Sequence, residues 1–196
     1  MTFDFFRQTV ETTQNPVILL EGTRAVESEM GAQLETFAAR LAARFPHAIF
    51  RSGNADGADS YFARGVAQVD ATRLQLVVPQ SGHRRSNRPQ GAAIYSLDKL
   101  ENDAELVMQT VAASPIYEFL AANRKMPKFG VKFAYLLRDT LKVAGSEELN
   151  LAPTTIGLFF VNEQKPKSGG TAHTIRVCET AGVAVVEQFE WLKWAF

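Results

Sequence analysis

Cysteine is nearly absent from this chain: its 196 residues include one, Cys178. A lone cysteine cannot form an internal disulfide, and no group of cysteine and histidine residues has the spacing of a zinc site. We therefore expect a protein of the reducing cytoplasm, and we predict no metal and no cofactor.

An excess of charge and long apolar runs are also missing. Lysine and arginine number 21, as do aspartate and glutamate, so no overall basic field attracts nucleic acid and any such contact would have to be local. No apolar run approaches the ~18 residues of a membrane span. The N-terminal residues, which include Asp4 and Glu11, lack the basic and apolar regions of a signal peptide. We expect no membrane partner.

The residues that are present predict one globular α/β domain over residues 1–196, since 46% are hydrophobic and 21% charged. Apolar runs at 17–20, 48–51 and 74–78 alternate with helical spacing at 26–44 and 60–69. The same alternation returns with strands at 155–161 and 183–187 around a helix at 171–180. This order predicts a three-layer, Rossmann-like fold with a mainly parallel sheet.

Residues 80–150 interrupt that rhythm. A polar, basic loop covers 81–89, and helical spacing follows at 98–122 and 129–142. We interpret the region as a helical insertion between the third and fourth strands. The last residues, 189–196, are rich in aromatics, so we expect the tail to pack on the domain or in an oligomer contact, and we expect a homo-oligomer.

Three glycine-containing turns, each between a strand and a helix, are the candidate ligand-binding features. In parallel sheets such turns meet at the carboxyl edge, where helix N-termini attract anions. The first and third turns would hold phosphate, with Arg24 or Arg138 as countercharge. The predicted binding residues are Gly22, Thr23, Arg24, Ser52, Gly53, Asp56, Gly57, Asp59, Arg138, Ser168, Gly169, Gly170 and Thr171.

Two aspartates of the second turn have different expected roles. Asp59 is placed to cap the helix that follows, whereas Asp56 is placed to accept hydrogen bonds from ribose hydroxyls. Both are the candidate catalytic carboxylates, should the protein be an enzyme. The third turn lacks the spacing of a P-loop, which argues against a Walker-type ATPase. His173 in the helix after that turn is more typical of a surface or packing residue than of a phosphate ligand.

Taken together, these turns resemble the SLOG superfamily, which joins the Rossmann-like domain of bacterial DNA-processing protein A to the LOG, or lysine-decarboxylase-like, nucleotide hydrolases. The resemblance covers 17–78 and 153–187, and the pair Arg138-Asp139 is similar to one that often precedes the fourth strand in the superfamily. It implies a nucleotide or nucleotide-derived ligand at the glycine turns.

The resemblance leaves the chemistry open. LOG hydrolases carry a glutamate three residues after the threonine of their glycine-rich turn, and the corresponding residue here is Thr174. Our main hypothesis is therefore binding of a nucleotide-type small molecule, with the protein acting as a sensor. The alternatives are a nucleoside-monophosphate N-glycosidase that uses Asp56 or Asp59, and a less favoured single-stranded nucleic-acid binder that uses the basic loop at 83–88.

Overall fold

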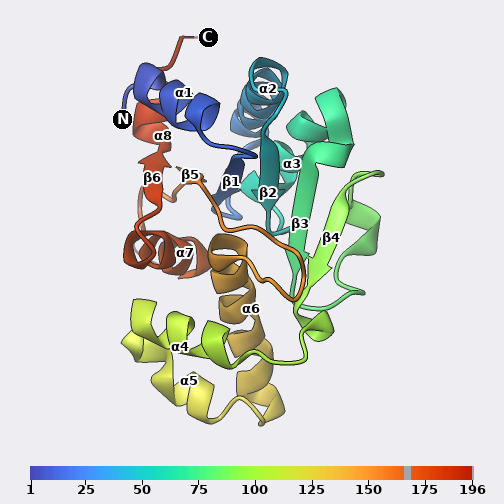
Figure 1. Cartoon of the computed structure of the whole chain (residues 1–196), viewed down its shortest axis with the longest axis vertical. Helices are drawn as coiled ribbons and strands as arrows, with labels where there is room; N and C mark the ends of the chain where they lie inside the picture. Colours follow the sequence, from blue (N-terminus) through green and yellow to red (C-terminus); the bar gives the residue numbers. More distant parts are fainter. Residues whose placement is uncertain (166–168, 196) are drawn as a thin grey trace.

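A computed structural model describes residues 1–165 and 169–195, and in these residues it contains one sheet of six parallel strands (Figure 1). The strand order is β4-β3-β2-β1-β5-β6. In chain order the main elements are α1 (Phe3–Thr12), β1 (Val17–Gly22), α2 (Ser28–Arg44), β2 (Ile49–Ser52), α3 (Ala58–Asp70), β3 (Leu74–Val78), β4 (Ala93–Ser96), α4 (Ala104–Ala113), α5 (Glu118–Ala122), α6 (Pro127–Ala144), β5 (Ile156–Phe160), α7 (Gly169–Thr180), β6 (Ala184–Glu187) and α8 (Gln188–Trp191).

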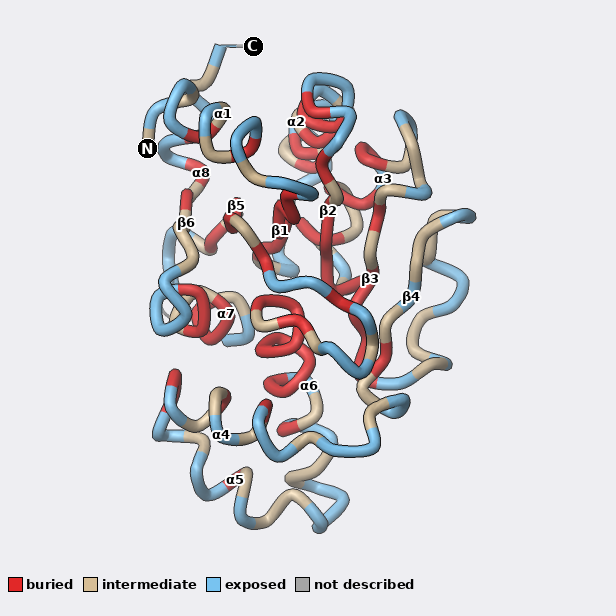
Figure 2. Tube along the Cα trace, in the orientation of Figure 1, coloured by how far each residue is buried: buried red, intermediate tan, exposed pale blue. Residues whose placement is uncertain are grey.

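Helices cover both faces of the sheet because side chains on a strand alternate between faces. On β1, Ile18 and Leu20 pack with α1, α2, α3 and α8 in one cluster, whereas Leu19 packs with α4, α6 and α7. All six residues of β1 are buried, and Figure 2 shows the central strands as buried along most of their length. The result is the three-layer, Rossmann-like architecture that the sequence predicts.

The strand order reverses beside β1, which pairs with β2 on one side and with β5 on the other. The connection from β1 to β2 therefore moves the chain toward one edge of the sheet, and the connection from β5 to β6 moves it toward the other edge. In open parallel sheets the crevice outside the carboxyl ends of the strands at such a reversal is the usual ligand site. The turn after β1 and the start of α7 both lie at this crevice.

The region expected to be wholly an insertion contains one more strand. β4 pairs with β3 from Ala93 to Ser96, so the helices α4, α5 and α6 follow the fourth strand of the sheet, not the third as expected. β4 is a four-residue edge strand in which Ser96 alone is buried. Its sequence therefore lacks the apolar run that marks the buried strands.

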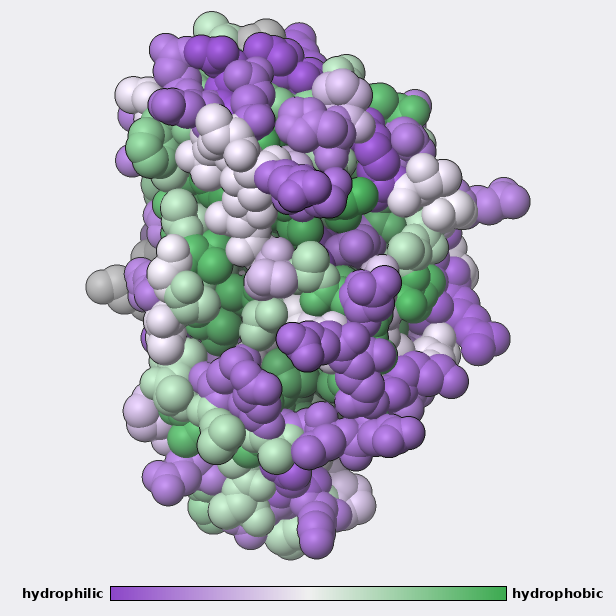
Figure 3. Space-filling view, in the orientation of Figure 1, coloured by the Kyte–Doolittle hydropathy of each residue, from purple (hydrophilic) through white to green (hydrophobic). Residues whose placement is uncertain are grey.

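The helices between β4 and β5 form one end of the molecule, at the bottom of the view in Figure 1. Their inner faces pack around Phe133, Leu136 and Leu141. Several apolar side chains on the outer faces are exposed, and Figure 3 shows green residues interspersed with purple ones over this end. The exposed apolar residues on α4 to α6 and their connections are Met108, Ile116, Phe119, Met126 and Val131.

The aromatic tail packs on the domain, which was the first of the two alternatives. The ring of Trp194 lies 4.7 Å from that of Phe6, and Trp191 is 1% exposed and donates to the carbonyl of Phe159. The two ends of the chain therefore meet on one side of the sheet (Figure 1).

A homo-oligomer remains a prediction. In the described residues no helix is both long and apolar enough to cross a membrane.

Helices α2 and α3 approach closely at Gly65, where an added Cβ would lie 2.1 Å from the carbonyl oxygen of Glu35. We expect Gly65→Ala to lower the free energy of unfolding by roughly 1 to 3 kcal/mol, because the overpacking outweighs the better helix propensity of alanine. Urea denaturation measures this change. The control is Gly82→Ala, because a Cβ at Gly82 meets nothing within 4 Å; equal stability of the two variants would contradict the prediction.

Candidate functional site

A cleft of about 550 Å³ opens at the carboxyl edge of the sheet, beside the reversal of strand order. Residues from the turn after β1, the turn after β2, the basic loop, helix α6 and the start of α7 line it. They are Glu21, Gly22, Thr23, Arg24, Ala25, Ala55, Asp59, His83, Arg84, Tyr135, Arg138, Asp139, Asn162, Lys165, Gly169, Gly170 and Thr171. Its size falls within the ~300 to 1,000 Å³ of common small-molecule sites.

Asp59 joins the first two turns to each other. Its carboxylate accepts from the N–H of Gly22 at 3.2 Å, and from the N–H groups of Gly53 at 3.1 Å and Ala55 at 3.4 Å. The side chain is 1% exposed and makes no capping bond at the start of α3. The expected cap is therefore wrong, and Asp59 instead satisfies turn donors that would otherwise be buried without partners.

Backbone donors of the first turn are already used within the protein. The N–H of Thr23 donates to the carbonyl of Phe160 at 2.8 Å, in addition to the Gly22 bond to Asp59. A phosphate on these two N–H groups, as the sequence suggested, would have to displace both bonds. Arg24 is different: it is exposed, lines the cleft and forms no ion pair within the described part of the chain.

Arg138 covers the second turn. Its guanidinium donates to the carbonyl of Gly53 at 3.2 Å, and a Cβ at Gly53 would lie 1.7 Å from the same nitrogen. Gly57 has a φ of 78°, and a Cβ there would lie 2.5 Å from the backbone of Arg24. Both glycines therefore make room for close packing beneath the cleft. Gly53, Gly57 and Ser52 do not themselves line it.

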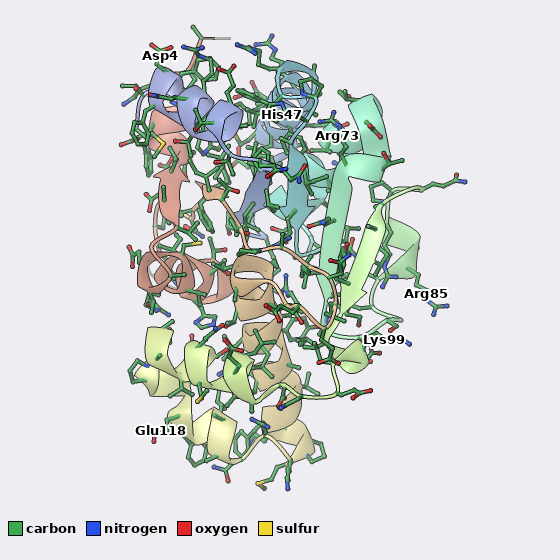
Figure 4. All side chains as sticks on the ribbon, in the orientation of Figure 1. Asp4, His47, Arg73, Arg85, Lys99 and Glu118 are labelled. Atoms are coloured by element: carbon green, nitrogen blue, oxygen red, sulfur yellow. The ribbon has the colours of Figure 1, made fainter. Side chains whose placement is uncertain are left out.

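Asp56 points to the basic loop. Its carboxylate pairs with Arg84 at 2.6 Å, and Asn54 donates to the Arg84 carbonyl at 3.3 Å. Arg88 bonds the carbonyls of Ser81 and His83 inside the loop, whereas Arg85 points away from the body of the molecule in Figure 4. Asp56 does not line the cleft, so its predicted contact with ribose requires the pair with Arg84 to open.

The start of α7 supplies the third turn. Gly169, Gly170 and Thr171 line the cleft, and N–H groups in the first turn of a helix have no partner within the helix. Ser168 lies outside the described residues. A carboxylate is already nearby, because a Cβ at Gly170 would lie 3.0 Å from Oδ2 of Asp139.

A buried charge cluster forms the floor of the cleft. The ammonium of Lys142 contacts Oε2 of Glu21 at 2.5 Å and Oδ1 of Asp139 at 2.9 Å, and Arg138 pairs with the same oxygen of Asp139 at 3.3 Å. Thr174 donates to Oε1 of Glu21 at 2.9 Å. Lys142 is fully buried, and the nearby carboxylates raise its pKa, despite the opposite effect of burial. It therefore stays charged.

Glu21 occupies an environment that favours its protonated form. Burial raises the pKa of this carboxyl to about 7, and the attraction of Lys142 opposes the shift without cancelling it. Asp139 and Asp59 add like charge on the same side. The pKa of Glu21 is therefore raised even though Lys142 contacts its carboxylate.

His173 is a buried packing residue, as expected. Its ring nitrogens lie 3.0 Å from the hydroxyl of Ser114 and 3.3 Å from that of Thr140. Burial lowers the pKa of His173 to about 4, so the ring is neutral at physiological pH. Arg176 donates to the same Ser114 hydroxyl, which links α7 to the end of α4.

An aromatic pair flanks the polar part of the cleft. The rings of His83 and Tyr135 lie 5.8 Å apart in an edge-to-face arrangement, and both residues line the cleft. Burial and the neighbouring arginines lower the pKa of His83, which favours its neutral form. Within residues 1–165 and 169–195, no group of three or more His, Cys, Asp or Glu side chains could hold a metal ion.

The cleft thus brings together most of the predicted binding residues. It is lined by Gly22, Thr23, Arg24, Asp59, Arg138, Gly169, Gly170 and Thr171, while Ser52, Gly53, Asp56 and Gly57 lie behind or beside it. Ligand contacts by any of them remain a prediction. Glu21, Lys142 and Tyr135 were not among the predicted site residues. A sequence signal existed for Glu21 and Lys142. Each is a charged residue in an otherwise apolar segment, Glu21 at the end of β1 and Lys142 on α6.

Comparison with known proteins gives distant similarities. No family model and no curated protein matches the chain. DNA processing protein A from Helicobacter pylori, a single-stranded-DNA-binding protein, is 16% identical with a TM-score of 0.48, over 92% of this chain and 67% of that one. DNA processing protein A from Streptococcus pneumoniae is 14% identical with a TM-score of 0.47, over 92% of this chain and 51% of that one.

The chain therefore spans about half the length of the second protein and two thirds of the first.

We expect Lys142→Met to lower the free energy of unfolding by roughly 3 to 5 kcal/mol, because it leaves two buried carboxylates without their shared cation. The double variant Glu21→Gln, Lys142→Met should lose less than the sum of the two single variants. A double-mutant cycle from urea unfolding measures the coupling. Strictly additive losses would show that the Lys142–Glu21 contact contributes no coupling to stability.

The depressed pKa of His173 predicts an acid-sensitive term in stability. The unfolded chain takes up a proton below about pH 6.5, whereas the folded chain does so only below about pH 4, so this term lowers stability as pH falls between those values. Between pH 7 and 5, the parent should lose roughly 1 to 2 kcal/mol more than His173→Gln. Urea unfolding at the two pH values measures the difference. Equal losses would show that the ring titrates normally.

Proposed function

We propose that this protein binds a nucleotide or a nucleotide-derived small molecule in the cleft. The observation that carries the proposal is the meeting, in one cleft of about 550 Å³ at the reversal of strand order, of a helix N-terminus, arginine side chains and an aromatic pair. Such a site offers separate places for a phosphate and for a base.

The phosphate would bind at the rim. Arg24 is an exposed cation without an ion-pair partner in the described residues, and it lines the cleft together with Thr171 at the start of α7. An arginine fork and helix N–H groups are the donors that bind phosphate most strongly. The base would stack on Tyr135 or His83, which line the same cleft.

Catalysis as an N-glycosidase has weaker support. Thr174 occupies the helix position where LOG hydrolases carry their glutamate. Its hydroxyl donates to Glu21 of the buried charge cluster and to the carbonyl of Gly170. Of the two candidate catalytic carboxylates, Asp59 is bound by three N–H groups and Asp56 lies outside the cleft. A glycosidase needs a carboxylate at the reacting bond. We infer little or no hydrolysis of nucleoside monophosphates.

Binding of single-stranded nucleic acid is the remaining alternative. The loop at 83–88 is basic, but Arg84 pairs with Asp56 and Arg88 holds the loop together. These contacts leave few cations for a run of phosphates. A single-stranded oligothymidine that binds tightly, with affinity falling steeply as salt rises, would favour this alternative over the small-molecule site.

A thermal-shift screen against adenosine, guanosine, cytidine and uridine monophosphates tests the proposal. At ~100 times its dissociation constant, a ligand adds roughly 2.7 kcal/mol to stability. Arg24→Ala should weaken binding about tenfold or more, because a hydrogen bond to a charged group contributes ~1.5 to 3 kcal/mol. Arg40→Ala is the matched control, since Arg40 is also exposed but lies outside the cleft.

Three results would contradict the proposal. No stabilisation by any of the four nucleotides would exclude the nucleotide classes tested. Equal weakening by Arg24→Ala and Arg40→Ala would place the phosphate elsewhere. Stabilisation by inorganic phosphate as large as that by nucleotides would remove the base from the recognised group. Chromatography of the same mixtures reports any release of free base.

A further inference from the structure

Asp139 is a buried carboxylate that lines the cleft. It lies on α6 in the helical segment, is 2% exposed and is among the residues that line the cleft floor. Its Oδ1 is paired with two cations, Nζ of Lys142 at 2.9 Å and Nε of Arg138 at 3.3 Å. These ion pairs compensate the cost of burying Oδ1, so a ligand would donate to the other oxygen.

The other oxygen of Asp139 faces the first turn of α7. A Cβ at Gly170 would lie 3.0 Å from Oδ2, so the glycine leaves room beside this oxygen, and both residues line the cleft. Any larger residue at position 170 would place carbon against the oxygen. The carboxylate is therefore approached from the cleft beside Gly170.

The charges of the cleft are arranged in two zones. The buried floor holds Glu21 and Asp139 together with Arg138, whereas the rim holds the exposed Arg24 and the half-buried Arg84. A phosphate on the floor would face like charge, and an ammonium group there would face Lys142 and Arg138. Neutral hydrogen-bond donors fit the floor better than either, and hydroxyl groups are the neutral donors of a nucleotide sugar.

We propose, as an inference that rests on the proposed function, that Asp139 accepts hydrogen bonds from the ribose hydroxyls of the ligand while the rim binds its phosphate. The ligand is then a ribonucleotide, not a deoxyribonucleotide. This assigns to α6 the role that the sequence suggested for Asp56, whose carboxylate is paired with Arg84. A site built around a substrate hydroxyl strongly rejects the analogue that lacks it.

The test compares each of the four ribonucleoside monophosphates with its 2′-deoxy counterpart by titration calorimetry at fixed salt. Since a hydrogen bond to a charged group contributes ~1.5 to 3 kcal/mol, each ribonucleotide should bind about tenfold or more tightly than its partner. In Asp139→Asn the ratio should fall to about threefold or less, because the acceptor becomes neutral.

Gly170→Ala provides a second route to the same result, should Asp139→Asn fail to fold. Its methyl group covers the carboxylate while the ion pairs with Lys142 and Arg138 stay in place. The ribo-to-deoxy ratio should fall in this variant too. A ratio that both variants leave unchanged would overturn the assignment to Asp139.

The outcomes separate the two proposals. Equal binding of ribo and deoxy partners, or tighter binding of the deoxy partner, would overturn the ribose inference and leave the nucleotide site standing. No binding of any of the eight compounds would overturn the proposed function itself, together with the inference that depends on it.

Discussion

The contacts of Lys142 with Glu21 and Asp139 fix the relative positions of the elements that form the floor of the cleft. Through it α6 is fixed to the end of β1, and Thr174 extends the connection to α7. Three elements far apart in the chain thus meet at one ammonium group that is fully buried. A buried charge without a partner is costly. Displacing any of the three elements would leave a buried charge of this cluster without its partner.

A second buried cation contacts the same end of the helix. Arg51 on β2 donates to the carbonyls of Lys142 and Ala152 and to the side chain of Gln75, and burial lowers the pKa of its guanidinium to about 10. It remains charged at neutral pH. The Lys142 carbonyl, which lies in the last turn of α6 and has no helical partner, therefore receives a cation from the sheet. Lys142 is thus bound through both its ammonium group and its backbone carbonyl.

Local pattern was sufficient to predict the buried strands and the turns that follow them. The apolar run before Gly22 and that before Ser52 both form central strands, and their turns lie where parallel topology requires. β4 escaped prediction because an edge strand with one buried residue has little apolar signal. The glycine turns were informative because each directly follows an apolar run, and the parallel strand order brings their ends to one edge of the sheet.

Side-chain partners were much harder to predict. Glu21 and Lys142 are 121 positions apart, and no local spacing shows that they meet. Asp59 was expected to cap α3, but the N–H groups of two turns attract its carboxylate instead. Asp56 was assigned to a ligand, and Arg84 from a distant loop pairs with it. In each case tertiary structure supplied a partner that competes with the local one.

The position of Arg138 over Gly53 makes the helical segment inseparable from the sheet. The guanidinium occupies the space that a side chain at position 53 would need, with its nitrogen 1.7 Å from the Cβ site. A side chain at position 53 would therefore require Arg138 to move or to be replaced. Gly53 follows a central strand of the sheet, whereas Arg138 belongs to the segment between β4 and β5. Excising that segment would remove the guanidinium that fills the space above the second turn.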